Sequence, residues 1–194
     1  MRSVKRQYVL RARAAHAART RARIVEALIR LHQEVGPRNT TISAIAARAG
    51  VERLTVYRHF KSEAEMFDAC SHRYLELNPP PDPLAWAGEM DPAQRTRRGL
   101  EALYAFFSRT WPMFEKVYRD AVECASLKPI MDQFDAYLRN LAGDLAAVWP
   151  RGKAASRRQV ILRHATKFST WQSLEAEGVD NGQKLTLMLE WLST

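Results

Sequence analysis

The stretch from Thr40 to Phe60, TTISAIAARAGVERLTVYRHF, constrains the fold of this chain more than any other. Ile42, Ile45 and Ala46 have the i, i+3, i+4 spacing of residues on one helical face. Thr41 stands just before them, where a hydroxyl oxygen can accept the free backbone N–H groups of a first turn. The pattern therefore predicts a short helix that begins after Thr41.

A tight turn and a second short helix are expected next. Gly50 stands where the chain must leave the first helix through a left-handed conformation. Glu52 can accept backbone N–H groups at the start of the second helix, although Glu is a weaker cap than Ser or Asp. Val56 and Phe60 lie four residues apart and face inward, which leaves an outward face made largely of Arg53, Tyr57 and Arg58. Two helices joined by a short turn with Gly form the helix-turn-helix pattern, whose second helix reads the DNA major groove; the alternative is an ordinary helical hairpin.

Basic residues are concentrated in the front third of the chain. Residues 1–61 carry 14 Lys/Arg and 3 Asp/Glu, a net charge of +11, whereas residues 62–194 carry 16 and 18, a net charge of −2. This segregation indicates a polyanion partner bound by the front third, since a merely solvated surface would not divide so sharply. Residues 1–23 hold eight Lys/Arg and no acid. We expect a frayed tail that runs into a helix, serving either as an arm on phosphates or the minor groove or as a mobile solubilising tail.

The remaining composition narrows the class of protein. A chain of 194 residues with 46% apolar content can bury a sizeable core. Cys70 and Cys124 are far apart without metal-ligand spacing, which suits a reducing cytoplasm. No apolar run approaches the ~18–20 residues of a membrane span, and the N-terminus lacks the apolar segment of a secretory signal. No Ser/His/Asp set, phosphate-binding Gly loop or metal-ligand cluster stands out, so we predict a cytoplasmic protein that is no enzyme and holds no cofactor or metal.

The helix-turn-helix stretch resembles the DNA-binding motif of TetR-family transcriptional regulators. The matching pieces are Ile45-Ala46, Ala49-Gly50-Val51, Thr55-Val56-Tyr57, His59-Phe60, Lys61-Ser62-Glu63 and Met66-Phe67. Leu54 stands where the family often has a small residue, and Glu63 where it often has Lys. The resemblance implies an all-α fold of about nine helices, with an N-terminal helix-turn-helix DNA-binding domain and a C-terminal helical domain for ligand binding and dimerisation.

Prolines mark the domain boundary that we expect. The segment Asn78-Pro79-Pro80-Pro81-Asp82-Pro83 cannot continue a helix. We therefore divide the chain into a basic N-terminal arm (residues 1–20), a helix-turn-helix domain (21–78), a Pro-rich linker (79–91) and a helical effector-binding and dimerisation domain (92–194). Within the helix-turn-helix domain, Ser62 and Glu65 form a capping-box pattern at the start of a further helix.

Residues that begin or end helices, chiefly Pro, Gly and Asp, predict five helical segments in the second domain. The first opens at Asp91-Pro92 and is expected to end at Trp111-Pro112, before a segment that runs to about Ala125. A long helix opens at Lys128-Pro129. The next is expected to be one helix holding Val160 to Leu174 and stopping at Gly178, and Asp180 caps a short terminal helix.

The resemblance carries DNA contacts over to eight positions of this chain. They are Thr41, Arg53, Leu54, Thr55, Tyr57, Arg58, His59 and Lys61. Arg53 is the predicted base contact, since an Arg that pairs with guanine contributes ~1–3 kcal/mol of discrimination. Leu54 would pack on a thymine methyl or within the core. Thr55, Tyr57 and His59 would contact phosphates or base edges. Thr41 and Lys61 would hold phosphates at the two ends of the motif, and Arg58 would add a backbone contact or be merely exposed.

Two further sets of residues follow from the resemblance in the second domain. An effector pocket is expected among the aromatic residues Tyr104, Phe107, Trp111, Phe114, Tyr118, Phe134 and Trp171, although aromatic stripes at helical spacing also suit a plain core. A homodimer interface is expected on the last two helices at Val160, Phe168, Leu185, Met188, Trp191 and Leu192, unless these residues pack only in their own core.

The predicted function is a dimeric, ligand-responsive DNA-binding regulator, most simply a repressor on a near-palindromic operator. Its partners would be double-stranded DNA, a small-molecule effector and a second copy of the chain, without a membrane. Two other classes stay open: a basic architectural DNA-binding protein without an effector, and an enzyme or lipid-binding module with a vestigial DNA-binding head.

Overall fold

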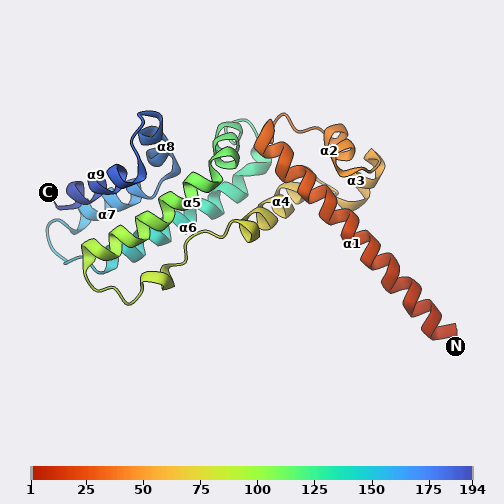
Figure 1. The fold of residues 1–194 in the computed structure, drawn as a ribbon, viewed down its shortest axis with the longest axis horizontal. Helices are drawn as coiled ribbons and strands as arrows, with labels where there is room; N and C mark the ends of the chain where they lie inside the picture. Colours follow the sequence, from red (N-terminus) through yellow and green to blue (C-terminus); the bar gives the residue numbers. More distant parts are fainter. Residues whose placement is uncertain (1, 194) are drawn as a thin grey trace. The chain divides into compact units, whose positions relative to one another are not determined.

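The computed structural model describes residues 2–193, with side chains from residue 7 onward except at position 9. Helices alone make up the regular structure of this part of the chain, which confirms the expected all-α fold (Figure 1). Its nine α-helices are α1 (Arg2–Glu34), α2 (Ile42–Ala49), α3 (Arg53–His59), α4 (Glu63–Leu77), α5 (Pro92–Asp120), α6 (Lys128–Ala147), α7 (Ala155–Ala165), α8 (Phe168–Ala176) and α9 (Asn181–Ser193). Two 3₁₀ turns, η1 (Pro83–Trp86) and η2 (Ala125–Leu127), join them.

The chain divides into two compact units. The first unit holds residues 1–77 together with residues 112–130, and the second holds residues 78–111 and 131–194. The break at 77/78 falls at the proline segment. Residues 112–130, which the sequence analysis grouped with the second domain, pack with the first unit because α4 and η2 contact each other.

The first helix is longer than the sequence suggested. α1 begins at Arg2, where we expected a frayed tail. Its residues up to Val35 include neither Gly nor Pro and are rich in Ala and Arg, both strong helix formers. The expected apolar stripe is confirmed, with Ile24, Val25, Leu28, Ile29 and Leu31 all buried.

The expected capping at Ser62 is confirmed. Ser62 Oγ accepts the backbone N–H of Glu65 at 3.2 Å, and Glu65 Oε2 accepts the backbone N–H of Lys61 at 2.8 Å. The carboxylate therefore returns to the residue before the cap and holds the end of α3 against the start of α4.

The expectation that Trp111-Pro112 ends a helix is wrong. α5 runs unbroken from Pro92 to Asp120 with Pro112 inside it. Proline removes one N–H and crowds the preceding turn, at a cost of about 3 kcal/mol. Buried residues on both sides of Pro112, including Phe107, Met113 and Phe114, offset that cost.

The single helix expected from Val160 to Leu174 is also wrong, because the chain divides there into α7 and α8. Thr166 follows α7, and its hydroxyl shares its one proton between Leu162 O at 3.0 Å and Arg163 O at 3.3 Å. A Thr side chain that takes the last carbonyls competes with continuation of the helix. α9 begins as expected, with Asp180 Oδ1 accepting from Gln183 N at 2.9 Å.

Candidate nucleic-acid interface

The short helix α2 and the turn after it have the conformation that the sequence predicts. Thr41 Oγ1 accepts the N–H of Ala44 at 3.1 Å. Gly50 adopts φ 61° and ψ 45°, and the N–H of Val51 reaches Ala46 O at 3.0 Å. A left-handed residue at this point reverses the chain after two turns of helix, which sets α3 across α2. Glu52 precedes α3 but makes no side-chain capping bond, so that expectation is wrong; its longer side chain is a poorer cap than Asp.

α3 presents one buried and one open face. Val56 is fully buried and Phe60, which ends the helix, is 2% exposed. Leu54 and Tyr57 are large apolar side chains that are 55% and 50% exposed. Arg53 and Arg58 are exposed beside them, and neither forms an ion pair with a described residue. A seven-residue helix that leaves two apolar and two cationic side chains uncovered is suited to bind an external surface.

Contacts with α1 hold α2 and the end of α3 in place, and the sequence alone did not predict them. The guanidinium of Arg21 lies over the Phe60 ring, 4.6 Å from its centroid. Arg48 of α2 donates to both carboxylate oxygens of Glu34, at 2.7 and 2.6 Å. A bidentate pair of this kind fixes the orientation of two helices. These partners are 39 and 14 residues apart in sequence, so no local spacing could have revealed them.

The other predicted DNA-contact residues lie on the same stretch of chain, from Thr41 to Lys61, and none of them is fully buried. Thr41 and Lys61 are exposed at the two ends of the motif, and Thr55 and His59 are half-buried. Lys61 Nζ lies 3.4 Å from Tyr57 O, at the limit of a hydrogen bond. The structure thus gathers all eight residues on the α2–α3 segment, with Thr55 and His59 the least accessible.

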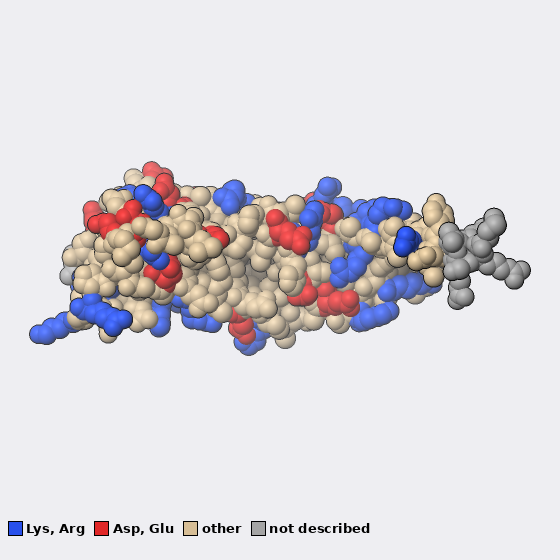
Figure 2. Space-filling view, turned by 90° about the horizontal axis from the view of Figure 1, so that it is seen from below, with Lys and Arg blue, Asp and Glu red and all other residues tan. Residues whose placement is uncertain are grey.

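The exposed part of α1 that precedes its buried stripe is strongly basic. Arg11, Arg13, Arg19, Arg21 and Arg23 are exposed, and the first acid of the chain is Glu26. Figure 2 shows blue side chains without red ones on the part of the surface next to the grey residues. A row of arginines without acids creates a positive potential that attracts polyanions.

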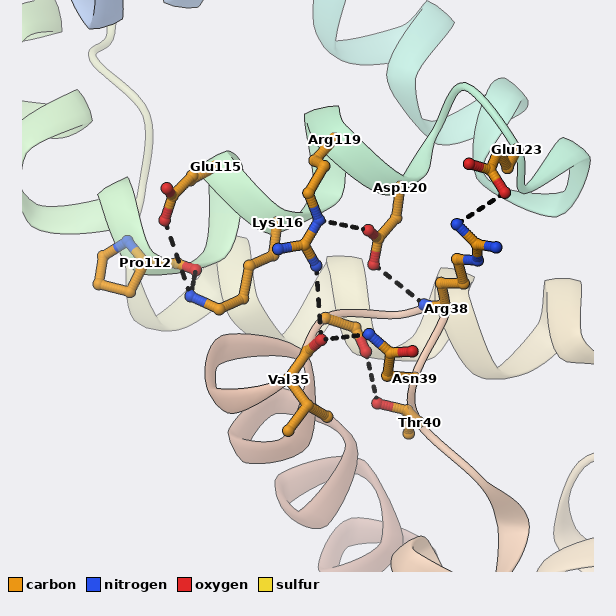
Figure 3. A network of polar contacts seen from close by, with 11 residues as sticks. Val35, Arg38, Asn39, Thr40, Pro112, Glu115, Lys116, Arg119, Asp120 and Glu123 are labelled. Atoms are coloured by element: carbon orange, nitrogen blue, oxygen red, sulfur yellow. Dashed lines mark hydrogen bonds and ion pairs between the residues drawn. The ribbon is translucent and has the colours of Figure 1, made fainter. Parts of the chain in front are cut away.

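The loop that follows α1 is fastened by a buried carboxylate (Figure 3). Asp120 is 3% exposed; it accepts Arg38 N at 3.1 Å and Arg119 Nε at 2.8 Å. Burial acts to raise the pKa of Asp120, but these two donors outweigh it and hold the pKa below its ordinary value. Glu123 pairs with the Arg38 guanidinium at 2.7 Å. Both carboxylates therefore hold the connection between α1 and α2.

The residues predicted for an effector pocket are mostly packed against one another. In the second unit, Tyr104, Phe107 and Trp171 are at most 1% exposed. The Phe107 ring lies 5.3 Å from that of Phe168 and 5.9 Å from that of Trp171, and Trp111 lies 5.5 Å from Trp171. Phe134 also lies in this unit, whereas Phe114 and Tyr118, 6.2 Å apart, belong to the first. The pocket stays a prediction, and these rings would have to separate to admit a ligand.

The residues predicted for a dimer interface fall into two groups. Phe168, Leu185, Met188 and Leu192 are buried within the second unit. Val160 on α7 and Trp191 on α9 are 65% and 43% exposed. Leu187, 45% exposed on α9, is a further uncovered apolar side chain that the sequence analysis did not single out. The interface stays a prediction, with its uncovered part on α7 and α9.

Comparisons with known proteins agree with this architecture. Residues 24–70 match the model of a family described as bacterial regulatory proteins, tetR family. The fold is similar to that of a TetR-like transcriptional regulator from Rhodococcus sp. RHA1, with 19% identity over 89% of this chain and 93% of that chain at a TM-score of 0.63. It is also similar to a TetR transcription regulator from Haloarcula marismortui (16% identity, 90% and 94% covered, TM-score 0.60). A third similar structure is the multidrug binding protein EbrR complexed with imidazole (15% identity, 88% and 88% covered, TM-score 0.58). No match was found among curated protein sequences.

A helix-turn-helix segment at the basic end of a helical fold is the arrangement of a DNA-binding domain, and the family match covers this segment. The match to the tetR family of bacterial regulatory proteins covers the helix-turn-helix segment, residues 24–70, and the similarity in fold to the Rhodococcus regulator extends over 89% of the chain. Among the described helices, none is long and apolar enough to cross a membrane.

Proposed function

We propose that the protein is a ligand-responsive repressor that acts in the cytoplasm as a homodimer on a near-palindromic operator. The observation that carries this proposal is the open face of α3, where Leu54 and Tyr57 are about half exposed beside Arg53 and Arg58, which form no ion pair with a described residue. Exposing large apolar side chains without a partner is unfavourable for a free monomer, and the thymine methyl groups of a major groove would cover them.

Three kinds of contact account for operator recognition. Arg53, at the start of α3, reads a guanine edge, and Leu54 packs on a thymine methyl. Tyr57, Arg58 and the half-buried Thr55 and His59 contact phosphates or base edges. Thr41 and Lys61 hold phosphates on either side, and such contacts set register without reading sequence. The arginines of α1 add affinity that is independent of sequence and falls steeply with salt.

Dimerisation through α7 and α9 places two such heads on one duplex. Val160, Leu187 and Trp191 are uncovered apolar side chains on these helices, and pairing about a two-fold axis would cover the same surface on both copies. Heads related by a two-fold axis meet half-sites ~34–36 Å apart or a multiple of that spacing, and the operator must then be near-palindromic.

An effector enters the second unit among the aromatic side chains of α5, α6 and α8. The rings of Phe107, Trp111 and Trp171 offer a large apolar surface for a planar molecule, and the similar EbrR is a multidrug binding protein. The two conformations of the dimer differ in the separation of the DNA-binding heads, and the effector releases DNA only if it binds one conformation more tightly than the other. Equal affinity for both would leave the equilibrium between them unchanged.

The decisive experiment is selection of bound sequences from random duplex DNA, followed by titrations with two variants. We expect a palindrome with fixed half-site spacing. Arg53→Ala should lose sequence preference more than total affinity, whereas Lys61→Ala should weaken binding to all sequences about equally and flatten the salt dependence by about one unit of slope. Equal effects of both variants on operator and random DNA would refute the assigned roles, and selection without any enriched sequence would refute the function.

One observation favours a second candidate, a DNA-binding protein whose second unit only dimerises. Tyr104 is fully buried and donates to Ala165 O at 3.0 Å, so it already has the partner that a ligand would provide. A screen in which no small molecule releases the operator would support this architectural role over the ligand-responsive one.

A further inference from the structure

Charge is divided sharply within the second unit, between two neighbouring helices. Residues 145–174 contain six Lys/Arg and no acid, whereas residues 175–194 contain four acids and one Lys, a net charge of +6 against −3. The basic stretch includes α7 and the acidic stretch includes α9. Because α7 and α9 pack against each other, this unit carries opposite charges on adjoining helices.

The one lysine of the acidic stretch does not reduce the charge of its surface. Lys184 is fully buried, and its Nζ donates to Glu175 Oε2 at 2.5 Å. The other three acids, Glu177, Asp180 and Glu190, are exposed, and none of them forms an ion pair with a described residue. The surface formed by the α8–α9 connection and by α9 is therefore acidic.

A hollow that is open to solvent runs along the outer face of α9. Its volume is about 640 Å³, and its lining includes Asp180, Gln183, Leu187 and Glu190. All four residues are exposed, so a partner can reach them without any rearrangement. Leu187 and Glu190 are three residues apart and lie on one side of the helix. The hollow thus presents an apolar side chain followed, after one turn, by a carboxylate.

The exposed side of α7 has the counterpart of this arrangement. Val160 is 65% exposed, and Arg163 is exposed three residues further along the same helix. Arg163, like Glu190, forms no ion pair with a described residue. α7 therefore presents an apolar side chain followed by a cation, at the same spacing at which α9 presents an apolar side chain followed by an anion.

The two faces together fit a second copy of this chain better than any other partner. A contact about a two-fold axis requires a surface that is complementary to itself. One surface that carries both the Val160–Arg163 pair and the Leu187–Glu190 pair meets this requirement. A polyanion would be repelled by the acidic half of the surface, and a polycation would be repelled by the basic half.

We propose that α7 of each copy lies in the α9 hollow of the other, with Val160 on Leu187 and Arg163 paired with Glu190 at both symmetry-related contacts. This inference rests on the proposed homodimer and names what selects the partner. The ion pairs act on specificity, because a chain with a different charge pattern on these two helices would bring like charges together and be rejected.

Charge reversal at each member of the pair, followed by mixing, tests this assignment. Arg163→Glu alone brings two carboxylates together at both contacts, and Glu190→Arg alone brings two guanidinium groups together. Sedimentation equilibrium should give each variant a dimer Kd about 100-fold above that of the wild type. An equimolar mixture should recover a Kd within about ten-fold of the wild type, because each reversed residue then meets an opposite charge at both contacts. Native mass spectrometry should show the mixed dimer in excess over either homodimer.

A chain that carries both reversals tests the selection of the partner. Arg163→Glu with Glu190→Arg restores opposite charges between two identical copies, so this double variant should dimerise with itself. With the wild type it would meet like charges at both contacts, and mixed dimers should be depleted in the mass spectrum. Random mixing of the double variant with the wild type would overturn the proposed selection.

The matched controls change the same charges elsewhere in the second unit. Arg139→Glu on α6 and Glu101→Arg on α5 alter residues that are exposed and lie outside α7 and α9. Each should dimerise as tightly as the wild type, and the two should mix at random. Preferential mixing of these controls would show that net charge alone directs association and would overturn the assigned pair.

The outcomes separate this inference from the proposed function. A monomeric wild type would overturn the homodimer itself. A dimeric wild type whose Kd is unaffected by either reversal, or whose reversed variants associate no better when mixed, would overturn the pairing alone. If a reversed variant does not fold by circular dichroism, the wild-type dimer decides the question. Raising the salt concentration from about 50 mM to about 500 mM should weaken it, since salt screens opposite charges, and a dimer that salt leaves unchanged or tightens would overturn the pairing.

Discussion

At the scale of single residues, Gly36 and Asp120 determine how the loop after α1 packs in the first unit. Gly36 has φ +90°, a conformation that side chains rarely adopt. A Cβ atom at this position would lie 2.4 Å from Asp120 Oδ2 and 2.6 Å from Arg119 Nη2. Glycine thus lets the loop after α1 approach a carboxylate that holds it from the other side.

Gly36→Ala should destabilise the protein more than Gly50→Ala. Both positions have positive φ, which costs a non-glycine residue about 1–2 kcal/mol. At Gly50 the nearest atom to an added Cβ is 3.9 Å away, whereas at Gly36 the added atom must displace Asp120 and its hydrogen bonds, at a further cost of about 1 kcal/mol or more. Urea unfolding of the two variants measures the difference, and equal losses would show that the close approach to Asp120 is not needed.

The buried imidazole of His32 predicts a loss of stability in mild acid. Its pKa is about 4 in the folded protein and ordinarily 6.5, so the unfolded chain binds the proton more readily. The stability is fully present above pH 6.5 and is lost as the pH falls towards 4. Between pH 7 and pH 5 the loss should be about 2 kcal/mol. His32→Phe should lack this loss and His72→Phe should keep it, as urea unfolding at both pH values would show. Parallel pH curves for the wild type and folded His32→Phe would contradict the assignment.

At the scale of elements, the length of α5 is the clearest case of packing that overrides local preference. Pro112 disfavours helix, yet the helix continues for eight residues beyond it to Asp120. Those eight residues carry Met113 and Phe114, which are buried, and Asp120, which holds the loop after α1. The tertiary contacts at the C-terminal end of α5 therefore depend on a helix that Pro112 disfavours.

Pro112→Ala should stabilise the protein. The substitution restores an N–H and relieves crowding, a gain of about 3 kcal/mol, and it loses about 0.4–1 kcal/mol because the unfolded chain becomes more flexible. The net gain should be about 2 kcal/mol. Pro92→Ala is the matched control, since a proline in the first turn of the same helix costs no hydrogen bond and its removal should give no gain. A lower urea midpoint for Pro112→Ala would mean that the proline shapes α5 in a way the contacts require.

At the scale of the whole molecule, the proposed homodimer would form through α7 and α9. Apolar surface is uncovered there at Val160, Leu187 and Trp191. Within its own chain, the ring of Trp191 packs edge-on against that of His164, with centroids 5.9 Å apart. Interfaces are enriched in aromatic side chains that a partner can cover, so Trp191 is the best anchor for a two-fold contact.

Trp191→Glu should convert the dimer into a folded monomer. A carboxylate at the centre of an apolar interface would face its symmetry mate and lose its hydration. Sedimentation equilibrium measures the mass and circular dichroism the helix content. Leu84→Glu is the control, because Leu84 is 78% exposed on η1 and should leave the dimer intact. A wild-type monomer, or a Trp191→Glu variant that stays dimeric, would contradict assembly through this face.

Local sequence determined the features that depend on neighbouring residues. The cap at Thr41, the left-handed Gly50 and the inward Val56 follow from hydrogen-bond groups and periods that lie within a turn or two, and together they define α2, α3 and the open face. Tertiary structure alone decided that α5 passes Pro112, that Arg21 covers Phe60 and that Asp120 fastens the loop after α1. Each of these depends on burial or charge pairing between residues far apart along the chain, and such free energies exist only once the chain has folded.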